Sequence, residues 1–590
     1  MGQRPIYTHT RSQTRLCKKA LNTPYFYIAL TFAIQVNSKE MAYKIGISRD
    51  TLNPYPNCLE DCIDSDNEVR VIDAFVGWLD LETLGFQHAT DNHLGTSIYP
   101  PSMLLKLYLY GYLNRIRSSR RLELECTRNI ELHWLLQKMT PKYHTISDFR
   151  KDHVVVLKSV FQEFTQFCIT LSLIEGEIIA CDGTKIRAQN NAKNNFNAAR
   201  LKKLLARIDL KTLEYGQYLT ELDEQDKKDS SVIAPLIKGK TKEDIEKSLA
   251  LLEKRRTIYT DYQTQLVKLA AEGCSTEHLQ ISTVDPDARS LPFKQSTTEV
   301  GYNVQTVGDA KHSLIVHFDV TNVGDNNALS TLTQATKDIL NIPPQMGFTA
   351  LADTGYHSGL QLKECADQNI ITFVSPPEPP APKDPNEQQF TKDQFIYDSQ
   401  KNVYTCPNKL ELPTNGTWYE HKGNRVGLKN RKYKQYTLPA KICKDCPFVE
   451  KCLGNRLKSW HGKTIERTEY DDAVEANLKR VSQNRAAYQK RKEIIEHPFG
   501  TIKRTYGYYY TLLRTKEKVT GEFSLIYLCY NLRRVISILG VQGLKQALNE
   551  PILRIKLFCK HFRSLFFLTA IKTTQKMLAF NPNKRLLMTL

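Results

Sequence analysis

The stretch Ile178-Ile-Ala-Cys-Asp-Gly-Thr-Lys-Ile186 decides the fold prediction. A short apolar run leads to Asp182 and a glycine follows at once, which is the pattern of a β-strand that delivers a carboxylate before the chain turns. The stretch Phe348-Thr-Ala-Leu-Ala-Asp-Thr-Gly-Tyr356 repeats this pattern around Asp353. The two stretches therefore predict a sheet with two carboxylates at the ends of its strands.

A third acidic residue, Glu496, belongs to a predicted helix. It follows Tyr488-Gln-Lys-Arg-Lys-Glu-Ile-Ile495, a run of good helix formers, and Pro498 comes soon after it. Glu493, one turn earlier, is an alternative candidate for the third carboxylate of the site. Carboxylates are hard ligands for Mg2+ or Mn2+, and two such ions roughly 3.5–4 Å apart can hold both oxygens of a displacement at phosphorus. Three carboxylates predict a two-metal phosphoryl-transfer centre.

The composition predicts several domains and a partner rich in phosphate. The chain has 590 residues, of which 41% are hydrophobic and 25% charged, and its formal net charge is +19. A charge of this size is typical of proteins that bind nucleic acid. Basic runs at 115–121 and 429–434 place small polar or aromatic residues among the cations. The alternative for any single run is a solvated surface.

Fourteen cysteines are too few for a disulfide scaffold, so a reducing cytoplasm is expected, with the protein associated with the nucleoid. The apolar stretch at 25–34 has the outline of a signal peptide but no clear cleavage site. Met41 opens a segment that reads like a natural amino terminus. The apolar stretch at 564–571 is too short to cross a membrane. No transmembrane segment and no membrane partner are predicted.

The order of predicted elements is that of an RNase H-like fold. An Asp-bearing strand is followed by a hairpin over 301–307 and 313–320, a helix, a second Asp-bearing strand, a helix, a strand and the Glu-bearing helix. The fold class is α/β, a mixed sheet with flanking helices, preceded by an all-helical domain and interrupted by a helical insert and a cysteine-containing insert.

The predicted boundaries follow from shifts in composition and from Pro-rich stretches. They are 1–40 for an extension, 41–175 for a helical DNA-binding domain, 176–375 for the first part of the core with a helical insert at 190–280, 376–475 for a Pro-rich linker and the cysteine insert, 476–545 for closing helices of the core, and 546–590 for a tail.

Four arginines of the basic run at 115–121 are predicted to bind DNA from the helical domain. These are Arg115, Arg117, Arg120 and Arg121. The alternative is that they pair with Glu123, Glu125 and Glu131, and the sequence does not decide between the two.

The cysteine insert carries Cys406 and then Cys443, Cys446 and Cys452. The x2 spacing of Cys443 and Cys446 lets both thiols reach one ion, so a structural Zn2+ site is one interpretation. Against it stand the irregular gap to Cys452, the long gap from Cys406, and the usual fate of a cytosolic cysteine as a small buried hydrophobe. An iron–sulfur centre is a third interpretation.

A set of short motifs occurs in one order along the chain: Tyr110-Gly-Tyr, Ser118-Ser-Arg, Arg128-Asn, Thr145-Ile-Ser-Asp-Phe-Arg150, Asp182-Gly-Thr-Lys185, Asp285-Pro-Asp-Ala288, Gly301-Tyr-Asn-Val-Gln305, Ala352-Asp-Thr-Gly-Tyr356 and Glu496-His-Pro-Phe-Gly500. In these motifs the chain resembles the DDE transposases of bacterial insertion sequences, in the branch with an amino-terminal helical transposase domain and a cysteine-bearing insert before the final Glu. The resemblance runs from about Met41 to about Gly540.

The resemblance implies that Asp182, Asp353 and Glu496 bind two Mg2+ or Mn2+ ions and form the catalytic triad. Lys503, seven positions after Glu496, resembles the lysine of the family's Tyr-Arg-Glu-Lys signature, a cation that would hold a phosphate at the cleaved end.

The first half of that signature leaves an alternative open. Tyr488 and Arg491 have its mutual spacing, but Arg491 lies five positions before Glu496, where relatives often show four. Lys492 occupies that place. Arg491 and Lys492 therefore compete for one role, and both are predicted, with Tyr488, to contact DNA.

The resemblance implies an enzyme that binds the terminal inverted repeats of its own element in double-stranded DNA. It would assemble as a homo-oligomer, a dimer on DNA, cut with metal-activated water, and join the freed 3′-hydroxyl to target DNA. The alternative is a catalytically inactive, domesticated transposase that acts as a DNA-binding repressor or architectural protein. The presence of all three carboxylates and Lys503 favours the enzyme.

Overall fold

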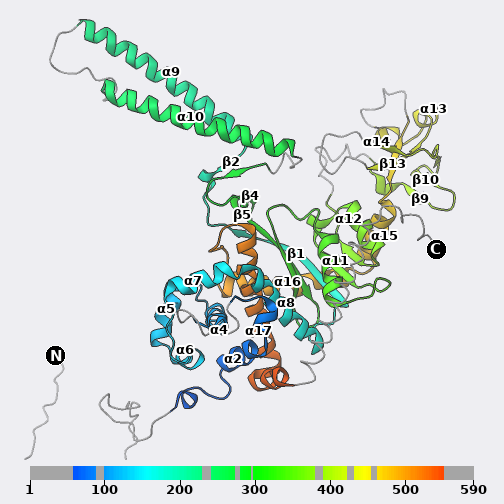
Figure 1. The fold of residues 1–590 in the computed structure, drawn as a ribbon. Coiled ribbons are helices and arrows are strands. Elements are labelled where there is room, and N and C mark those ends of the chain that lie inside the picture. The colour runs from blue at the N-terminus through cyan, green and yellow to red at the C-terminus, as the bar shows by residue number, and fades with distance from the viewer. Residues whose placement is uncertain are drawn as a thin grey trace, which may run out of the picture. The chain divides into compact units, whose positions relative to one another are not determined.

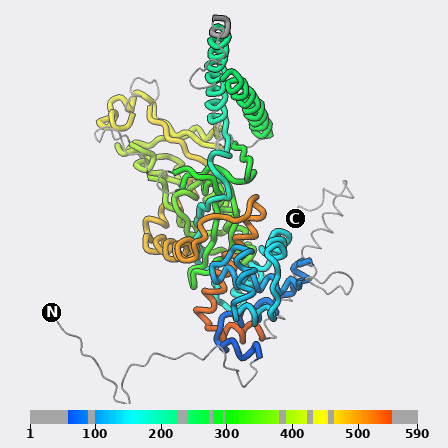
Figure 2. The backbone as a smooth tube through the Cα atoms, turned by 90° about the vertical axis from the view of Figure 1, so that its left-hand side faces the viewer, coloured from blue at the N-terminus to red at the C-terminus, as the bar shows by residue number. Residues whose placement is uncertain are grey.

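The computed structural model describes residues 58–87, 99–228, 241–272, 279–293, 297–378, 390–420, 431–453 and 462–550 (Figures 1 and 2). Every element described below belongs to the compact unit that begins at Leu59. The predicted extension at 1–40, most of the Pro-rich linker, and residues 551–590 of the predicted tail lie outside the described residues.

Helices occupy the segment before the first aspartate, as the sequence predicts. Pro101 begins α4 at the first helical position, where its fixed φ suits the turn. Almost every residue of α4 is buried, so this helix lies inside the helical region. The elements are η1 (Leu59–Cys62), α2 (Val69–Trp78), α3 (Leu81–Leu84), α4 (Pro101–Leu113), α5 (Ser119–Arg128), α6 (Ile130–Leu135), α7 (Tyr143–Asp152) and α8 (Val154–Thr170).

A six-stranded mixed sheet is built around β1. This strand pairs antiparallel with β5 and parallel with β7, and β7 pairs parallel with β8. The strand order is β4-β5-β1-β7-β8, with β6 beside β5, so the predicted hairpin is present as β5 and β6. The strands are β1 (Ile178–Arg187), β4 (Arg289–Pro292), β5 (Thr298–Asp309), β6 (Ile315–Thr321), β7 (Thr349–Ala352) and β8 (Ile371–Val374).

The two faces of β1 pack against different helices, because side chains alternate along a strand. Ile179 and Cys181 pack with α11 (Leu329–Leu340) and α12 (Gly359–Asp367). Ala180, which points to the other face, packs with Ile494 and Ile495 of α16 (Arg485–Gly500). The helix α15 (Asp471–Gln483) packs on α12 and β8.

The helical insert consists of two long helices that pack side by side (Figures 1 and 2). They are α9 (Ala198–Lys228) and α10 (Lys242–Ala271). The side chain of Thr241 caps α10 by accepting from the N–H of Asp244, whose carboxylate in turn accepts from the N–H of Thr241. The short strands β2 (Asn195–Phe196) and β3 (Ile281–Ser282) pair antiparallel at the base of the two helices, and η2 (Ala192–Asn194) precedes them.

The cysteine insert is a small region of short strands and helices with a hydrophobic cluster of its own. It contains two three-stranded sheets, of order β11-β10-β9 and β12-β13-β14. Its elements are η6 (Lys392–Gln394), β9 (Ile396–Asp398), β10 (Val403–Thr405), β11 (Glu411–Leu412), β12 (Tyr419–Glu420), β13 (Lys432–Thr437), α13 (Ala440–Lys444), α14 (Val449–Leu453) and β14 (Thr464–Thr468).

The amino-terminal helices and the sheet share one hydrophobic core. The helix α17 (Lys516–Asn549) lies between them and packs on α8, α2, α4 and β6. By length and composition, α17 is the one helix among the described residues that could cross a membrane, but most of its apolar stretch is buried in this core. The helical region is therefore not packed as an independent domain.

Glu522 of α17 is a fully buried carboxylate that connects distant segments. It accepts hydrogen bonds from the N–H groups of Leu512 and Leu513, and it pairs with Arg117, whose Nη1 lies 3.1 Å from its Oε1. The side chain of Arg117 is only 7% exposed and donates a second hydrogen bond to the carbonyl of Tyr510. The pair joins the loop before α5 to the start of α17.

Replacement of Glu522 should destabilise the protein strongly. We expect Glu522→Ala to lower the free energy of unfolding by about 3–5 kcal/mol, because it leaves a buried guanidinium without its counter-charge. Denaturation followed by circular dichroism measures the effect.

Two further variants test this cause. Arg117→Met combined with Glu522→Leu removes both charges and should cost less than the single change. Glu82→Ala, at an exposed carboxylate of α3, is the matched control. A loss below about 1 kcal/mol for Glu522→Ala, the size expected of a surface pair, would contradict the importance of this contact.

Candidate active site

Asp182 and Asp353 are neighbours because β1 and β7 are parallel and adjacent. The register pairs Cys181 with Ala352, and each of these residues immediately precedes one of the aspartates. Asp182 continues β1, whereas Asp353 is the first residue after β7. The structure thus brings the two carboxylates together, but the prediction that both lie at strand ends is wrong for Asp182, because β1 continues for five residues beyond it.

Glycine N–H groups orient both carboxylates. Oδ1 of Asp182 accepts from the N–H of Gly183 at 2.8 Å. Oδ1 of Asp353 accepts from the N–H of Gly355 at 2.9 Å and so caps the short helix η4 (Thr354–Tyr356). Each glycine thus serves a local hydrogen bond, but only Gly355 lies in a turn, because β1 continues through Gly183 to Arg187.

Burial and mutual repulsion make this pair costly to ionise. The pKa of Asp182 is raised to about 6, first by burial and then by the charge of Asp353, against the opposing influence of Arg491. Burial also raises the pKa of Asp353, again against the influence of Arg491. The pair is thus short of positive charge, which is the electrostatic condition for binding a cation.

Arg491 forms an ion pair with Asp182, and of the two rival cations it is the one that faces the aspartates. Its Nη1 lies 3.1 Å from Oδ2 of Asp182, and its side chain is only 12% exposed. Lys492, its rival from the sequence, is exposed. Tyr488, on the same helix, is half-buried. Arg491 therefore contacts a carboxylate in this structure, while its predicted contact with DNA stays a prediction.

Glu496 does not stand with the two aspartates here. It is exposed on α16, as is Glu493. At 3.6 residues per turn, Glu496 lies about 140° around the helix from Arg491, whereas the buried Ile494 and Ile495 lie within about 60° of it. Glu496 thus points away from the stripe of α16 that faces the sheet.

The aspartate pair fits a divalent cation by its donor atoms but does not complete a site. Carboxylate oxygens are the ligands that Mg2+ and Mn2+ prefer. Within the described ranges, however, no group of three or more Asp, Glu, His or Cys side chains is arranged to hold a metal ion. The predicted third ligand, Glu496, therefore stays a prediction.

Lys503 contacts the backbone of β1. Its Nζ donates to the carbonyl of Lys185, three residues after Asp182, at 2.9 Å. It belongs to the π-helical turn η8 (Thr501–Thr505) that follows α16. Nδ1 of His497, the residue after Glu496, lies 2.9 Å from the hydroxyl of Tyr530.

The structure adds Asp325, which sequence reasoning missed. Asp325 lies in the loop between β6 and α11 and raises the pKa values of both Asp182 and Asp353. Its Oδ1 accepts hydrogen bonds from Asn303 and Gln305 of β5. Asn303 and Gln305 belong to the motif Gly301-Tyr-Asn-Val-Gln305 of the sequence. Two amides on one face of a strand need an acceptor, and this need is the signal that pointed to a residue such as Asp325.

The basic run before α5 divides into exposed and buried arginines. Arg115, Arg120 and Arg121 are exposed. The prediction that Arg117 contacts DNA is corrected, because Arg117 is buried and its guanidinium binds Glu522 and a carbonyl.

The alternative partners predicted for these arginines are engaged elsewhere. Glu123 pairs with Lys142, Glu125 pairs with Arg128, and Glu131 accepts from Tyr110. The three exposed arginines therefore stay candidates for DNA contact.

The four predicted zinc ligands line one small cavity of the cysteine insert. Cys406 follows β10, Cys443 lies in α13, Cys446 lies two residues after α13, and Cys452 lies in α14. All four are free thiols. The pKa of Cys452 is raised by burial and, despite Lys463, by the other three cysteines.

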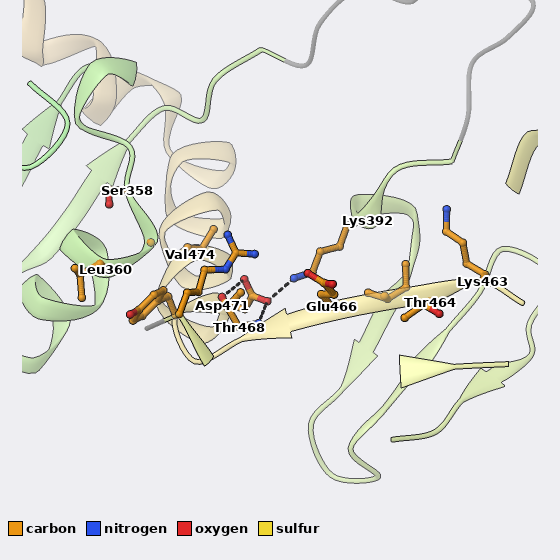
Figure 3. Close-up of a pocket in the computed structure, with 13 residues that line it drawn as sticks. Ser358, Leu360, Lys392, Lys463, Thr464, Glu466, Thr468, Asp471 and Val474 are labelled. Carbon is orange, nitrogen blue, oxygen red and sulfur yellow. Dashed lines mark hydrogen bonds and ion pairs between the residues drawn. The ribbon is translucent and has the colours of Figure 1, made fainter. Parts of the chain in front are cut away.

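A separate cavity lies where the insert meets the core, and it contains none of the predicted catalytic residues (Figure 3). Lys392 of the insert forms an ion pair with Asp471, the first residue of α15. Asp471 also accepts from the N–H and hydroxyl of Thr468 at 2.7 and 2.9 Å. These contacts fix the end of the insert to the core helices.

Two family models match the chain. One, described as a transposase domain, matches residues 57–152, and the other, described as a transposase DDE domain, matches residues 405–536. The first covers most of the helical region, and the second covers the cysteine insert and α16 with Glu496. Asp182 and Asp353 lie between the matched segments.

Among solved structures, a piggyBac transposase synaptic complex with hairpin DNA is similar over 85% of this chain and 80% of that chain, at 8% identity. The TM-score of 0.27 is too low for this likeness to carry an argument. The search of curated proteins gives no match.

The raised pKa of Asp182 predicts a stability that depends on pH in metal-free protein. The folded-state pKa of about 6 exceeds the ordinary value of 3.8, so the folded protein binds more protons between these values. The contribution of Asp182 to stability should therefore fall as pH rises from about 4 to 6, by about 1–3 kcal/mol.

Asp182→Asn should remove this contribution. In EDTA, the variant should gain stability relative to the parent as pH rises from about 4 to 7, as measured by denaturant titration at each pH. A difference between variant and parent that does not change with pH would contradict the prediction.

Proposed function

Because the chain belongs to the insertion-sequence DDE transposases, we propose that it binds the terminal inverted repeats of its own element and cuts DNA there. The observation that carries this proposal is the pair of half-buried, adjacent carboxylates of Asp182 and Asp353. Two crowded acidic groups that are short of positive charge suit a centre that takes up divalent cations.

We infer that the sheet is the core of an RNase H-like domain. The antiparallel strands β6, β5 and β1, followed by β7 and β8 parallel to β1, support this inference. Such a core would carry Asp182 on its central strand and Asp353 at the end of the neighbouring strand.

In the proposed reaction, Asp182 and Asp353 would hold Mg2+ or Mn2+, with Glu496 as the third carboxylate. When bound, two such ions activate water and stabilise the oxygens around the phosphorus atom. Arg491 neutralises part of the charge of Asp182, and Lys503 would neutralise phosphate charge beside β1. The freed 3′-hydroxyl would then attack target DNA.

The proposed partner is double-stranded DNA, bound by a homo-oligomer, a dimer on DNA, in the cytoplasm. The net charge of +19 and the exposed Arg115, Arg120 and Arg121 support contact with phosphates. Two ends of the element would be brought together by two copies of the chain.

A second candidate is a catalytically inactive, domesticated transposase that acts as a DNA-binding repressor or architectural protein. The exposed position of Glu496, apart from the aspartate pair, favours it. DNA binding without cleavage would be its signature.

The test is cleavage of a labelled duplex that carries the terminal repeat, with Mg2+ or Mn2+ and the full chain. We expect nicking at the repeat boundary by the parent. Asp182→Asn, Asp353→Asn and Glu496→Gln should each bind the duplex but cut it at least about 100-fold more slowly, as expected when a group that acts on the transition state is lost.

The matched control is Asp367→Asn, at an exposed carboxylate of α12, which should cut like the parent. Binding by the parent without cutting in either metal would establish the repressor. Normal cutting by Glu496→Gln, with loss in both aspartate variants, would remove Glu496 from the centre.

We propose further that the cysteine insert binds a structural Zn2+ ion. Support comes from the four free thiols around one cavity, since four thiolates are a common structural zinc site. A backbone N–H, that of Leu410, already points at Sγ of Cys406 at 3.4 Å, as it would toward a thiolate. No three of these four thiols are arranged around a common point in the structure, so binding would draw them together.

Elemental analysis of the purified full chain tests this. We expect about one zinc per chain, released by Cys443→Ser and by Cys446→Ser, because a structural site closes with four ligands. Cys126→Ser, at a buried cysteine of α5, should keep its zinc. A metal-free parent that takes up no zinc on titration would show that the thiols are only buried hydrophobic groups.

A further inference from the structure

A buried polar network lies beneath the aspartate pair, with Asp325 at its centre. Asn303 donates through Nδ2 to Oδ1 of Asp325 at 2.7 Å, and Gln305 donates through Nε2 to the same oxygen at 2.6 Å. Both amides are fully buried. Nδ2 of Asn303 also donates to the carbonyl of Val323 at 2.9 Å, which holds the loop before Asp325.

The network occupies the face of β1 opposite to Asp182. The antiparallel register pairs Gly183 with Gln305 and Lys185 with Asn303, and residues paired in this way share a face of the sheet. Because successive residues alternate, Asp182 points to the other face. Gly183 leaves bare backbone at the place where the amides and the carboxylate of Asp325 gather.

The carboxylate of Asp325 lies against both glycines that orient the aspartates. A Cβ added to Gly183 would stand 2.2 Å from Oδ1 of Asp325, so no larger residue fits there without displacing it. A Cβ added to Gly355 would stand 3.4 Å from Oδ2 of Asp325 and 3.1 Å from Oδ1 of Asp353. One side chain thus contacts the backbone after each predicted catalytic residue.

A tyrosine connects the network to the segment of Asp353. The hydroxyl of Tyr356, which follows Gly355, donates to Oε1 of Gln305, and Tyr356 is fully buried. The amide of Gln305 therefore joins Tyr356 on one side to Asp325 on the other. Three segments, β5, the turn after β7 and the loop before α11, are joined by these hydrogen bonds.

These contacts supply a route from Asp325 to the reacting groups. The N–H of Gly183 and that of Gly355 donate to Asp182 and Asp353, so a shift of either glycine turns the carboxylate that it orients. A displacement of about 1 Å in a catalytic group can cost about 100-fold in rate. The network therefore has the means to control the geometry of the pair without touching the substrate.

We propose that Asp325 is a positioning residue for DNA cleavage, which holds Gly183 and Gly355 so that Asp182 and Asp353 converge. This inference rests on the proposed function. Its requirement is a hydrogen-bond acceptor at Oδ1, since Asn303 and Gln305 both donate to that oxygen. An asparagine at position 325 keeps an oxygen acceptor, whereas an alanine does not.

The test compares Asp325→Asn with Asp325→Ala in the full chain. We expect Asp325→Asn to cut within about 5-fold of the parent and Asp325→Ala to fall by about 100-fold in kcat, with DNA affinity unchanged in both. Tyr356→Phe, which removes one hydrogen bond and keeps the ring, should fall between them. Asp338→Ala, at an exposed carboxylate of α11, is the matched control and should match the parent.

A second readout is the affinity for Mn2+, measured by electron paramagnetic resonance without DNA. The affinity for Mn2+ should weaken in Asp325→Ala, because the two aspartates would no longer converge in that variant. It should stay near the parent value in Asp325→Asn, which keeps the acceptor oxygen. Melting temperatures identify a variant that fails to fold, and Tyr356→Phe then carries the comparison.

The outcomes separate the two proposals. Equal loss in Asp325→Asn and Asp325→Ala would show that Asp325 acts by its charge and would overturn the positioning role. Parent-like cutting by Asp325→Ala and Tyr356→Phe would overturn it as well. A parent that binds DNA but never cuts would instead overturn the proposed function, and parent-like Mn2+ affinity in Asp325→Ala would then overturn the positioning role separately.

Discussion

The hydrogen bonding of β1 to a strand on each side is the constraint on which the rest of the site depends. Pairing with β7 in parallel places Asp353 next to Asp182, and pairing with β5 in antiparallel places Asn303 and Gln305 beside Gly183. Because a strand turns successive side chains to opposite faces, Asp182 and Gly183 serve different layers. A slip of one residue in either register would exchange these faces and dismantle both arrangements.

The electrostatics of the pair follow from the same packing. Arg491 lies within ion-pairing distance of Asp182, yet the pKa of that carboxyl remains at about 6, so burial and the neighbouring Asp353 outweigh the guanidinium. Asp325 adds a further negative charge from below. A single arginine therefore leaves the centre with unbalanced negative charge, and a group that brings two or more positive charges is the natural complement.

The sequence predicts those features that depend on local pattern and fails where partners are remote. The apolar runs before Asp182 and Asp353, each with a glycine close behind, were enough to predict a strand at each aspartate, whereas the adjacency of these strands comes from the pairing of β1 with β7. No such local pattern surrounds Asp325, because its hydrogen-bond partners are amides some 20 residues earlier in the chain. In the sequence, Arg117 looks like its exposed neighbours. In the structure it is buried, because it pairs with Glu522, which lies 405 residues away in the chain. The orientation of Glu496 could have been predicted from the sequence. Glu496 lies five positions after Arg491, and in a helix this spacing turns the two side chains about 140° apart.

The shared core links the basic surface to the carboxylates. Asp285 accepts from Tyr302 and from the N–H of Thr515, and Asp287 accepts from the N–H of Lys516, so the start of α17 is fixed to the sheet side. Glu522, further along the same helix, holds Arg117 of the helical region. Packed cores of this kind transmit displacement because they contain few voids. The exposed arginines near Arg117 are therefore held at a set position relative to β1.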